Sequence, residues 1–497
     1  MHPIDSGYDY IVLGGGTAGC VLAARLSESE QARVLLIERG RTMPIESREP
    51  ARWLSLSEGP LTWPGGTVVQ ASTGTSVPWA RGLGLGGSSG INGMVHIRGH
   101  RSSYDEWPGA GAKGWGFDDL LPFFRASETA PHRDPALRGQ HGPMTVAPVA
   151  DPHPVALATL AAATEVGHPL ADDISGGLEV GFGLPDLAIV DGHRLGAADA
   201  YLTPVLGRPT LNVATNALVH RVIVRNGRAV GVEFSIGDEL LTVSCSQEVV
   251  LAAGAVGSPE ILLRSGIGPS DHLRELGIDT VVDLPGVGED LHDHPISAMV
   301  HRAADPLPDS TGNHTEVLGL LASDGGAVPD LHLLVLSRPD APQGPTQGFV
   351  IAVGLMTPHS RGTLRLSSSD PTTHPLLDPR YLADDRDRAA MLAGLRLARE
   401  VAASPAFQPL DTAEIAPGEI PLDQYLKASL GTYYHYVGTC RIGTDDLAVV
   451  DTDLTVHGVA GLRVADASVM PSIPSANTNA TVLAIAERAA ALIAGRP

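Results

Sequence analysis

The chain has 497 residues, of which 43% are hydrophobic and 18% charged, as in a globular protein with a large core. Its formal net charge of −22 gives it no electrostatic route to nucleic acid or to an anionic membrane surface. We expect no transmembrane helix, because no apolar run of about 20 residues is present. Residues 1–8 lack the basic and apolar regions of a signal peptide, and three scattered cysteines favour a reducing cytoplasm over a disulfide framework.

The N-terminal segment predicts a βαβ unit. Residues 8–13 and 33–38 are short, apolar and rich in strand-forming side chains, and residues 17–29 carry Ala and Leu at helical spacing. The turn between the first strand and the helix is Gly14-Gly15-Gly16-Thr17-Ala18-Gly19, which has the GxGxxG pattern. With a strand before it and a helix after it, this turn predicts dinucleotide binding.

Each glycine of the turn has a physical role. Gly14 allows the tight turn, Gly16 lets the backbone approach a pyrophosphate, and Gly19 lets the helix pack closely on the strand. The helix N-terminus then offers free N–H groups to the phosphates. Glu38 ends the second strand, where its carboxylate can accept hydrogen bonds from ribose hydroxyls and would repel the extra phosphate of NADP. The turn does not by itself distinguish NAD from FAD.

Three further segments extend the predicted sheet and the cofactor site. Residues 81–98 are rich in glycine and serine, which suits either a second cofactor-wrapping stretch or a flexible loop. Residues 248–268 and 461–496 each predict a strand, a turn and a helix. Strands from remote parts of the chain therefore predict one parallel sheet that binds ligands at its carboxyl ends.

Four blocks, in this order, resemble the glucose–methanol–choline (GMC) oxidoreductase family over almost the full length of the chain. They are residues 14–19 with Glu38; residues 81–94 with 98–99 and 104–107; residues 254–268 with 284–288 and 293–295; and residues 435–440 with 461–479.

The resemblance implies an α/β fold with two interleaved domains. An FAD-binding, Rossmann-like domain with a parallel sheet is expected in residues 1–150, 206–295 and 431–497. An α+β substrate-binding domain built on an antiparallel sheet is expected in residues 151–205 and 296–430.

The resemblance also implies where FAD binds. The glycines of the first turn would hold the diphosphate, Glu38 the adenosine ribose, and the backbone of Val219 the adenine. Asn92 and Met94 would lie near the reactive ring, and Asp466 and Ala467 near the diphosphate or ribityl chain. The expected contacts are Gly14, Gly16, Thr17, Ala18, Gly19, Glu38, Arg39, Arg81, Gly86, Gly87, Ser88, Asn92, Gly93, Met94, Val95, Val219, Ala253, Gly254, Ser258, Asp466, Ala467, Asn477 and Thr478. Some relatives attach FAD through a histidine at the position of Ile91, so we expect non-covalent FAD here.

Two residues match the catalytic positions of the family. Alcohol oxidation requires loss of the hydroxyl proton and transfer of a hydride to flavin N5. His435 matches the catalytic histidine, and an imidazole can take up and return a proton near neutral pH. Asn477 matches the second position and would hydrogen-bond the substrate oxygen and fix its pose. The cofactor itself carries the hydride chemistry.

Other candidate residues are interpreted structurally. The tripeptide His292-Asp293-His294 could suggest a metal site, but no third remote ligand accompanies it, so we expect a structural loop near the cofactor and no metal. Cys440 follows the small Thr439 and is expected to be packed rather than nucleophilic.

The substrate domain is less informative. Residues 331–336 and 348–353 predict strands, and alternation places His332, Leu334 and Leu336 on one face. That face either lines the pocket or faces solvent or a helix. Tyr436 stands where the family often has proline, which leaves the substrate open.

The sequence therefore predicts an FAD-dependent alcohol dehydrogenase or oxidase. Its partners would be a small alcohol and an electron acceptor, either oxygen or a quinone, dye or protein. Two alternatives remain: a lyase similar to the hydroxynitrile lyases, with structural FAD, and a non-catalytic flavoprotein. The intact His435 and Asn477 argue against the second alternative.

Overall fold

The structure is a computed structural model that describes residues 4–310, 312–337 and 348–495. Residues 1–3, part of the predicted non-signal N-terminus, lie outside the described residues. Among the described helices, none combines the length and apolar character needed to cross a bilayer.

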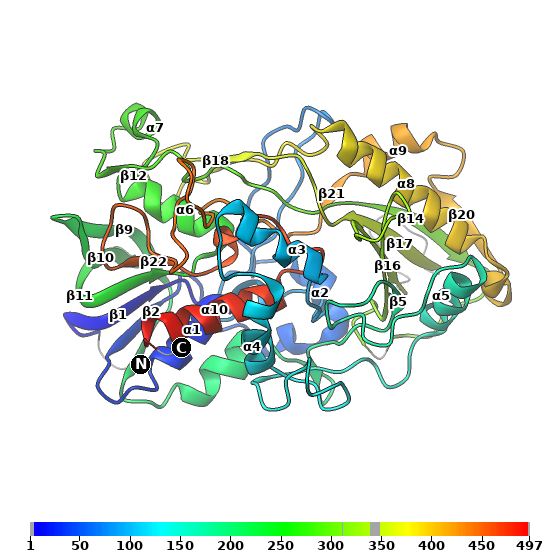
Figure 1. The fold of residues 1–497 in the computed structure, drawn as a ribbon, viewed down its shortest axis with the longest axis horizontal. Coiled ribbons are helices and arrows are strands. Elements are labelled where there is room, and N and C mark those ends of the chain that lie inside the picture. Colours follow the sequence, from blue (N-terminus) through cyan, green and yellow to red (C-terminus); the bar gives the residue numbers. More distant parts are fainter. Residues whose placement is uncertain (1–3, 311, 338–347, 496–497) are drawn as a thin grey trace.

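The first sheet contains the predicted βαβ unit at its centre (Figure 1). Strands β8 (Leu211–Ala214), β2 (Val34–Ile37), β1 (Gly7–Leu13) and β11 (Glu239–Leu251) run parallel in this order. The C-terminal end of β11 pairs in parallel with β22 (Leu462–Val464), while its N-terminal half pairs antiparallel with β10 (Arg228–Ile236), which continues to β9 (Ala217–Arg225). The three predicted remote strands therefore do belong to one sheet.

Three helices follow the carboxyl ends of these strands. α1 (Thr17–Leu26) and α10 (Asn479–Ile493) lie side by side, and α6 (Gly254–Arg264) packs near β9 (Figure 1). α1 ends at Leu26, earlier than the predicted residue 29, and the hydroxyl of the C-cap residue Ser27 donates to the carbonyl oxygen of Ala24. All three helices therefore begin at the same edge of the sheet.

The second sheet is antiparallel throughout. Its order is β20 (Thr412–Ala416), β14 (Pro295–Ala303), β17 (Gly348–Leu355), β16 (Leu331–Leu336), β15 (Val317–Leu321) and β5 (Gly181–Gly183), and β21 (Gly431–Thr432) also pairs with β14. The two strands predicted from residues 331–336 and 348–353 are β16 and β17. The expected α/β class is confirmed: the first sheet is parallel from β8 to β11 with an antiparallel extension at β10 and β9, and the second sheet is antiparallel.

The two faces of the second sheet have different neighbours. Leu333 and Val335 of β16 and Ile351 of β17 pack with residues of α5 (Pro154–Glu165) and α8 (Asp385–Ala402). The residues between them, Leu334 and Ala352, belong to a separate apolar cluster on the opposite face. One face is therefore covered by helices and the other is turned toward the first sheet.

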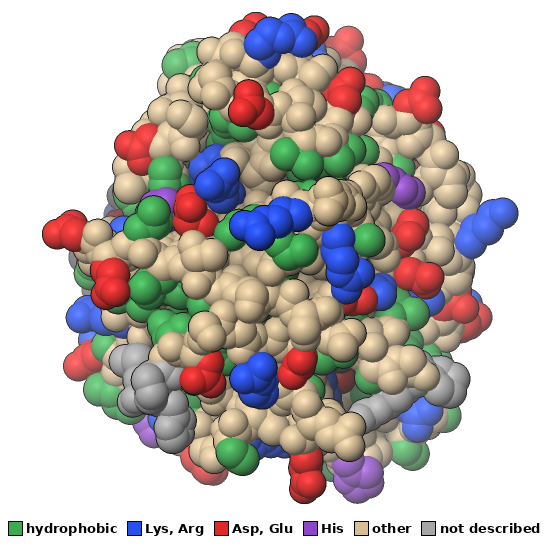
Figure 2. Space-filling model, turned by 90° about the vertical axis from the view of Figure 1, so that its left-hand side faces the viewer, with side chains coloured by type: hydrophobic (Ala, Val, Ile, Leu, Met, Phe, Trp, Pro, Cys, Tyr) green, Lys and Arg blue, Asp and Glu red, His purple; other side chains and the backbone are tan. Residues whose placement is uncertain are grey.

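The outer surface of the molecule on the side of the first sheet carries mixed charges (Figure 2). Figure 2 shows acidic, basic and small hydrophobic groups interspersed on the visible face, without one large field of a single sign. The net charge of −22 is thus not gathered into an acidic patch on that face.

Candidate active site

A cavity of about 630 Å³ lies between the two sheets. Its walls come from the carboxyl ends of β1, β2, β11 and β22, from the first turns of α1, α6 and α10, and from β14, β16 and β17. This is the edge at which a parallel sheet binds nucleotides. The antiparallel sheet closes the same cavity from the other side.

The glycine turn has the shape that a pyrophosphate requires. Gly14 has φ +105°, and a Cβ on Gly19 would lie 1.8 Å from the carbonyl oxygen of Gly14, so neither position accepts a side chain. Gly16 instead faces open space, because the atom nearest to a Cβ added there would be the Cα of Gly87 at 3.9 Å. The N-terminus of α1 has no side-chain cap and no acidic residue in its first turn. Its N–H groups are therefore free to bind an anion, as FAD would require.

Two carboxylates brace the cofactor edge. Glu38 accepts hydrogen bonds from the backbone N–H groups of Gly15 at 2.7 Å and Gly40 at 2.8 Å, and burial raises its pKa. Asp466 accepts from the N–H of Gly254 at 2.8 Å and from the hydroxyl of Ser258 at 2.5 Å. Asp466 thereby ties the end of β22 to the start of α6.

Most of the expected cofactor residues line the cavity, and three do not. Gly19 packs on Gly14, and Gly86 donates its N–H to Gly15 at 2.7 Å, in a left-handed turn at φ +94°. Ser258 is buried against Asp466. These three residues support the walls of the cavity from behind, whereas the sequence predicted that they would contact FAD directly. The expected residues that reach the cavity are Gly14, Gly16, Thr17, Ala18, Glu38, Arg39, Arg81, Gly87, Ser88, Asn92, Gly93, Met94, Val95, Val219, Ala253, Gly254, Asp466, Ala467, Asn477 and Thr478.

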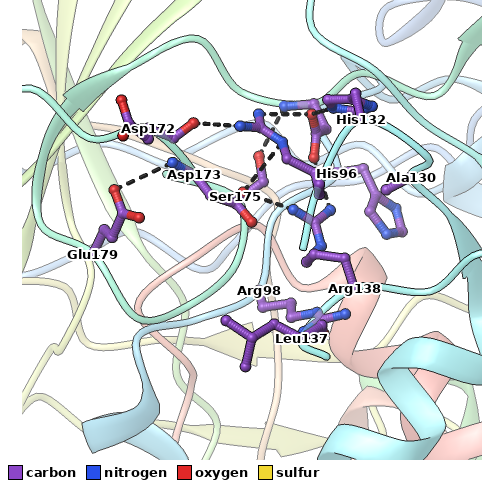
Figure 3. A network of polar contacts seen from close by, with 12 residues as sticks. His96, Arg98, Ala130, His132, Leu137, Arg138, Asp172, Asp173, Ser175 and Glu179 are labelled. Carbon is purple, nitrogen blue, oxygen red and sulfur yellow. Dashed lines mark hydrogen bonds and ion pairs between the residues drawn. The ribbon is translucent and has the colours of Figure 1, made fainter. Parts of the chain in front are cut away.

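The strand-like segment after Asn92 is anchored by a buried ionic network (Figure 3). Past Val95 the chain leaves the cavity, and the side chain of Arg98 reaches the Glu128 carboxylate at 2.5 Å. Arg138 contacts the same carboxylate at 2.8 Å and Asp186 at 2.7 Å. Although burial opposes it, the charge of Arg98 lowers the pKa of Glu128 well below its usual value. The network fixes the segment that borders the cofactor cavity.

His435 and Asn477 meet in this cavity. The side-chain amide nitrogen of Asn477 lies 3.3 Å from Nε2 of His435, and both residues line the cavity. Burial, and secondarily the nearby His332, lowers the pKa of His435 to about 3. His435 is therefore a neutral imidazole at neutral pH.

His294 determines which nitrogen of His435 carries the proton. Its Nε2 lies 3.1 Å from the carbonyl oxygen of Met356, so it must be protonated to donate there. Burial also lowers the pKa of His294, so its Nδ1 is left with a lone pair. That Nδ1 lies 3.0 Å from Nδ1 of His435, which must therefore be the donor. The Nε2 of His435 keeps its lone pair, which accepts a hydrogen bond from the side-chain amide nitrogen of Asn477 at 3.3 Å.

The tripeptide His292-Asp293-His294 holds this arrangement through bonds to protein atoms. Asp293 accepts from the hydroxyls of Tyr381 and Thr432, each at 2.5 Å, and from the backbone N–H of His435 at 2.6 Å. His292 accepts from the N–H of Ile473 at 3.0 Å. These contacts agree with the structural interpretation of the tripeptide. The sequence missed that His294 orients His435, because 141 positions separate them and no spacing pattern links them.

Tyrosines complete the surroundings of the base. Tyr433 lies against the His435 ring at a centroid distance of 4.6 Å. Tyr436, which stands where the family often has proline, lines the cavity and packs edge-on against Trp79 at 6.1 Å. Cys440 is fully buried, as expected for a packed thiol, and burial raises its pKa well above the usual value.

Comparisons with known proteins agree with this geometry. Two models described as GMC oxidoreductase match residues 8–296 and 358–486. Choline dehydrogenase, mitochondrial, from Homo sapiens is 37% identical, with 99% of this chain and 90% of that protein covered. Oxygen-dependent choline dehydrogenase from Photobacterium profundum is 34% identical, with 98% and 93% covered.

Solved structures are similar over the whole chain. Pyridoxine 4-oxidase from Mesorbium loti superposes with a TM-score of 0.93 at 34% identity, with 97% of this chain and 98% of that chain covered. A fungal aryl-alcohol oxidase has a TM-score of 0.88 at 26% identity, with 99% of each chain covered. The relatives named here are oxidases and dehydrogenases, and they give no support to the lyase alternative. The chain belongs to the GMC oxidoreductase family and is an FAD-dependent enzyme that oxidises a CH–OH group.

Proposed function

We propose that His435 is the catalytic base of this alcohol oxidation and that Asn477 positions the substrate oxygen. The observation that carries the proposal is the lone pair on Nε2 of His435, which the contact with His294 leaves unprotonated inside the cavity. The side-chain oxygen of Asn477 is buried and has no hydrogen-bond partner among the described residues. A substrate hydroxyl that donates its proton to Nε2 would replace the amide nitrogen of Asn477 there, and its oxygen could then accept from that amide nitrogen.

The residues of this chain then have separate tasks. His435 takes the hydroxyl proton on Nε2, and Asn477 holds the oxygen so that the carbon–hydrogen bond faces the flavin. Bound FAD supplies the hydride acceptor at N5. Tyr433 and residues of the apolar strands line the same space.

The remaining cofactor properties follow from the same walls. We infer that FAD is held without a covalent bond, since Ile91 is buried against Leu56 and Leu61 and offers no nucleophile. Acid precipitation of the purified protein should release all of the yellow flavin into the supernatant. Flavin that stays with the pellet would contradict this.

The domain division and the electron acceptor remain proposals. β14 to β20 fall within or at the edge of residues 296–430, which supports assigning that range to the substrate domain. The ranges 296–430 and 431–497 include some residues outside the described ones. We favour oxygen as the electron acceptor over a quinone, dye or protein, because oxidases are among the relatives. The cytoplasmic location of the protein stays a prediction.

The test is anaerobic reduction of the flavin by alcohols. The wild-type flavin should bleach and recover its colour when air is admitted. His435→Ala should slow bleaching by about 10²–10⁴-fold, because a general base is lost, and the exposed His374→Ala should not slow it. A rate for His435→Ala within tenfold of wild type would refute the assignment, and cyanide release from a cyanohydrin without bleaching would revive the lyase.

A further inference from the structure

The part of the cavity beyond His435 has an apolar wall, formed by one face of the antiparallel sheet. We call Ile296, Ala298, Val300, Leu334, Leu336, Val350 and Ala352 the tail wall; all seven line the cavity. We propose that this wall selects a neutral alcohol with an extended apolar tail, aliphatic or aryl, over a quaternary ammonium alcohol such as choline. The inference rests on the proposed role of His435.

The strand register arranges the wall in rows. His332, Gly354 and Ile296 form the first row, Leu334, Ala352 and Ala298 the second, and Leu336, Val350 and Val300 the third. A Cβ on Gly354 would lie 3.2 Å from the ring of Tyr433, which itself contacts His435. The first row is therefore next to the base. Successive rows lie about 6.6 Å apart, so the wall extends about 13 Å away from the reaction centre.

The wall carries no charge along this length. Among the described residues, the charged groups that line the cavity are Glu38, Arg39, Arg81, Glu260, Arg264 and Asp466. All of them come from the segments around the first sheet. The carboxylates have partners: Glu260 pairs with Arg264 at 3.3 Å, and Asp466 is saturated by four donor groups. None is placed to balance a cation that lies on the tail wall.

The aromatic side chains that line the cavity do not belong to the tail wall; they are Trp53, Trp63, Tyr425, Tyr433, Tyr434 and Tyr436. A quaternary ammonium can be held by several ring faces around one point. Trp63 already faces the guanidinium of Arg81 at 5.0 Å, and the ring of Tyr433 lies on His435. Burial, and secondarily the carboxylate of Glu58, raises the pKa of Tyr434, but Glu58 is exposed and does not line the cavity. A cation that lies on the tail wall would thus lose its hydration without a carboxylate to replace it.

The first experiment compares matched substrates on the holoenzyme. Choline is paired with its neutral isostere, in which a quaternary carbon replaces the quaternary nitrogen. The isostere should bleach the flavin anaerobically with a kcat/KM at least about a hundredfold higher, since the cation pays a desolvation cost. For straight-chain primary alcohols, kcat/KM should rise about fourfold with each added methylene until the tail extends past the third row.

A second experiment places a charge on the wall. Leu334→Glu should raise the ratio of kcat/KM for choline to that for the isostere by at least about tenfold, because the new carboxylate pairs with the cation. The matched control is Leu240→Glu, an exposed leucine on β11 outside the cavity, which should leave the ratio unchanged. If Leu334→Glu does not fold, Val350→Phe serves instead: it should lower kcat/KM for long alcohols more than for ethanol.

The outcomes separate this inference from the proposed function. If no alcohol bleaches the flavin, the proposed function fails first. If choline bleaches it as well as or better than the isostere, the enzyme is an alcohol oxidiser but the tail wall does not select neutral substrates. Equal rates for short and long alcohols in wild type and in Val350→Phe would overturn the placement of the tail.

Discussion

Replacing His294 should slow catalysis without weakening substrate binding. His294 contacts neither the proposed substrate position nor the cofactor-binding turn; its partners are Nδ1 of His435 and the carbonyl oxygen of Met356. In His294→Leu the N–H on Nδ1 of His435 would be buried without an acceptor. The ring would then favour the tautomer that carries its proton on Nε2, which cannot accept one from the alcohol.

The magnitude follows from one lost hydrogen bond. Leaving a buried donor unsatisfied costs about 1–3 kcal/mol, which corresponds to about 5- to 150-fold in the rate of flavin reduction. The chain offers a conservative rescue: in His294→Gln, the side-chain oxygen can accept from His435 while the amide donates to Met356. The glutamine variant should therefore recover most of the loss.

The assay is stopped-flow reduction of the bound flavin under anaerobic conditions over a range of alcohol concentrations. The limiting rate should fall in His294→Leu, and the apparent dissociation constant should change by less than about threefold, because no binding contact is removed. Flavin content and far-ultraviolet circular dichroism report whether each variant is folded. The reasoning is refuted if folded His294→Leu keeps its limiting rate within twofold, or if glutamine does no better than leucine.

Three other changes test the rest of the structure. Burial lowers the pKa of His301 to about 4 and that of His332 to about 3, so the protein is most stable above the pKa of unfolded histidine and loses stability as the pH falls below it. At about pH 5.5 each histidine should reduce the free energy of unfolding by about 1.4 kcal/mol, which lowers the urea midpoint. A urea midpoint that stays constant below about pH 6.5 would contradict this. Arg138→Met removes one buried positive charge from the network; Glu128 keeps Arg98 and Asp186 keeps Arg133, and the remaining excess of buried negative charge should cost about 3–5 kcal/mol in urea unfolding. The exposed Arg274→Met should cost less than about 0.5 kcal/mol. Gly16→Val should fold yet purify without flavin, because its side chain fills the space expected for the pyrophosphate; full flavin content would disprove that placement.

The sequence could predict the first sheet because its signals are local. A short apolar run, a glycine turn and an acidic residue define β1, α1 and Glu38 within one segment. The second sheet gave weaker signals. β15 and β17 are buried along their whole length, so they show no alternation of polar and apolar residues, and β14 begins at a proline. Only β16 and β17 were predicted, from their apolar composition.

In the candidate site, too, some residues could be predicted from the sequence and others could not. His435 and Asn477 were found through family motifs, and the structure brings them to 3.3 Å, while their catalytic roles stay predictions. The ionic network around Glu128 and the contact between His294 and His435 join remote segments through side-chain geometry alone. The face of β16 that the sequence left undecided lines the cavity at Leu334 and Leu336.

The strands that form the tail wall also hold His294, which orients the proposed base His435. His294 directly precedes β14, whose residues Ile296, Ala298 and Val300 belong to the tail wall. Its other partner, Met356, directly follows β17, which supplies Val350 and Ala352. A substrate tail that displaces these strands would also move the hydrogen bond that sets the tautomer of His435. Selectivity and rate should therefore change together across a series of alcohols, and the best-fitting tail should give the fastest reduction of the flavin as well as the tightest binding.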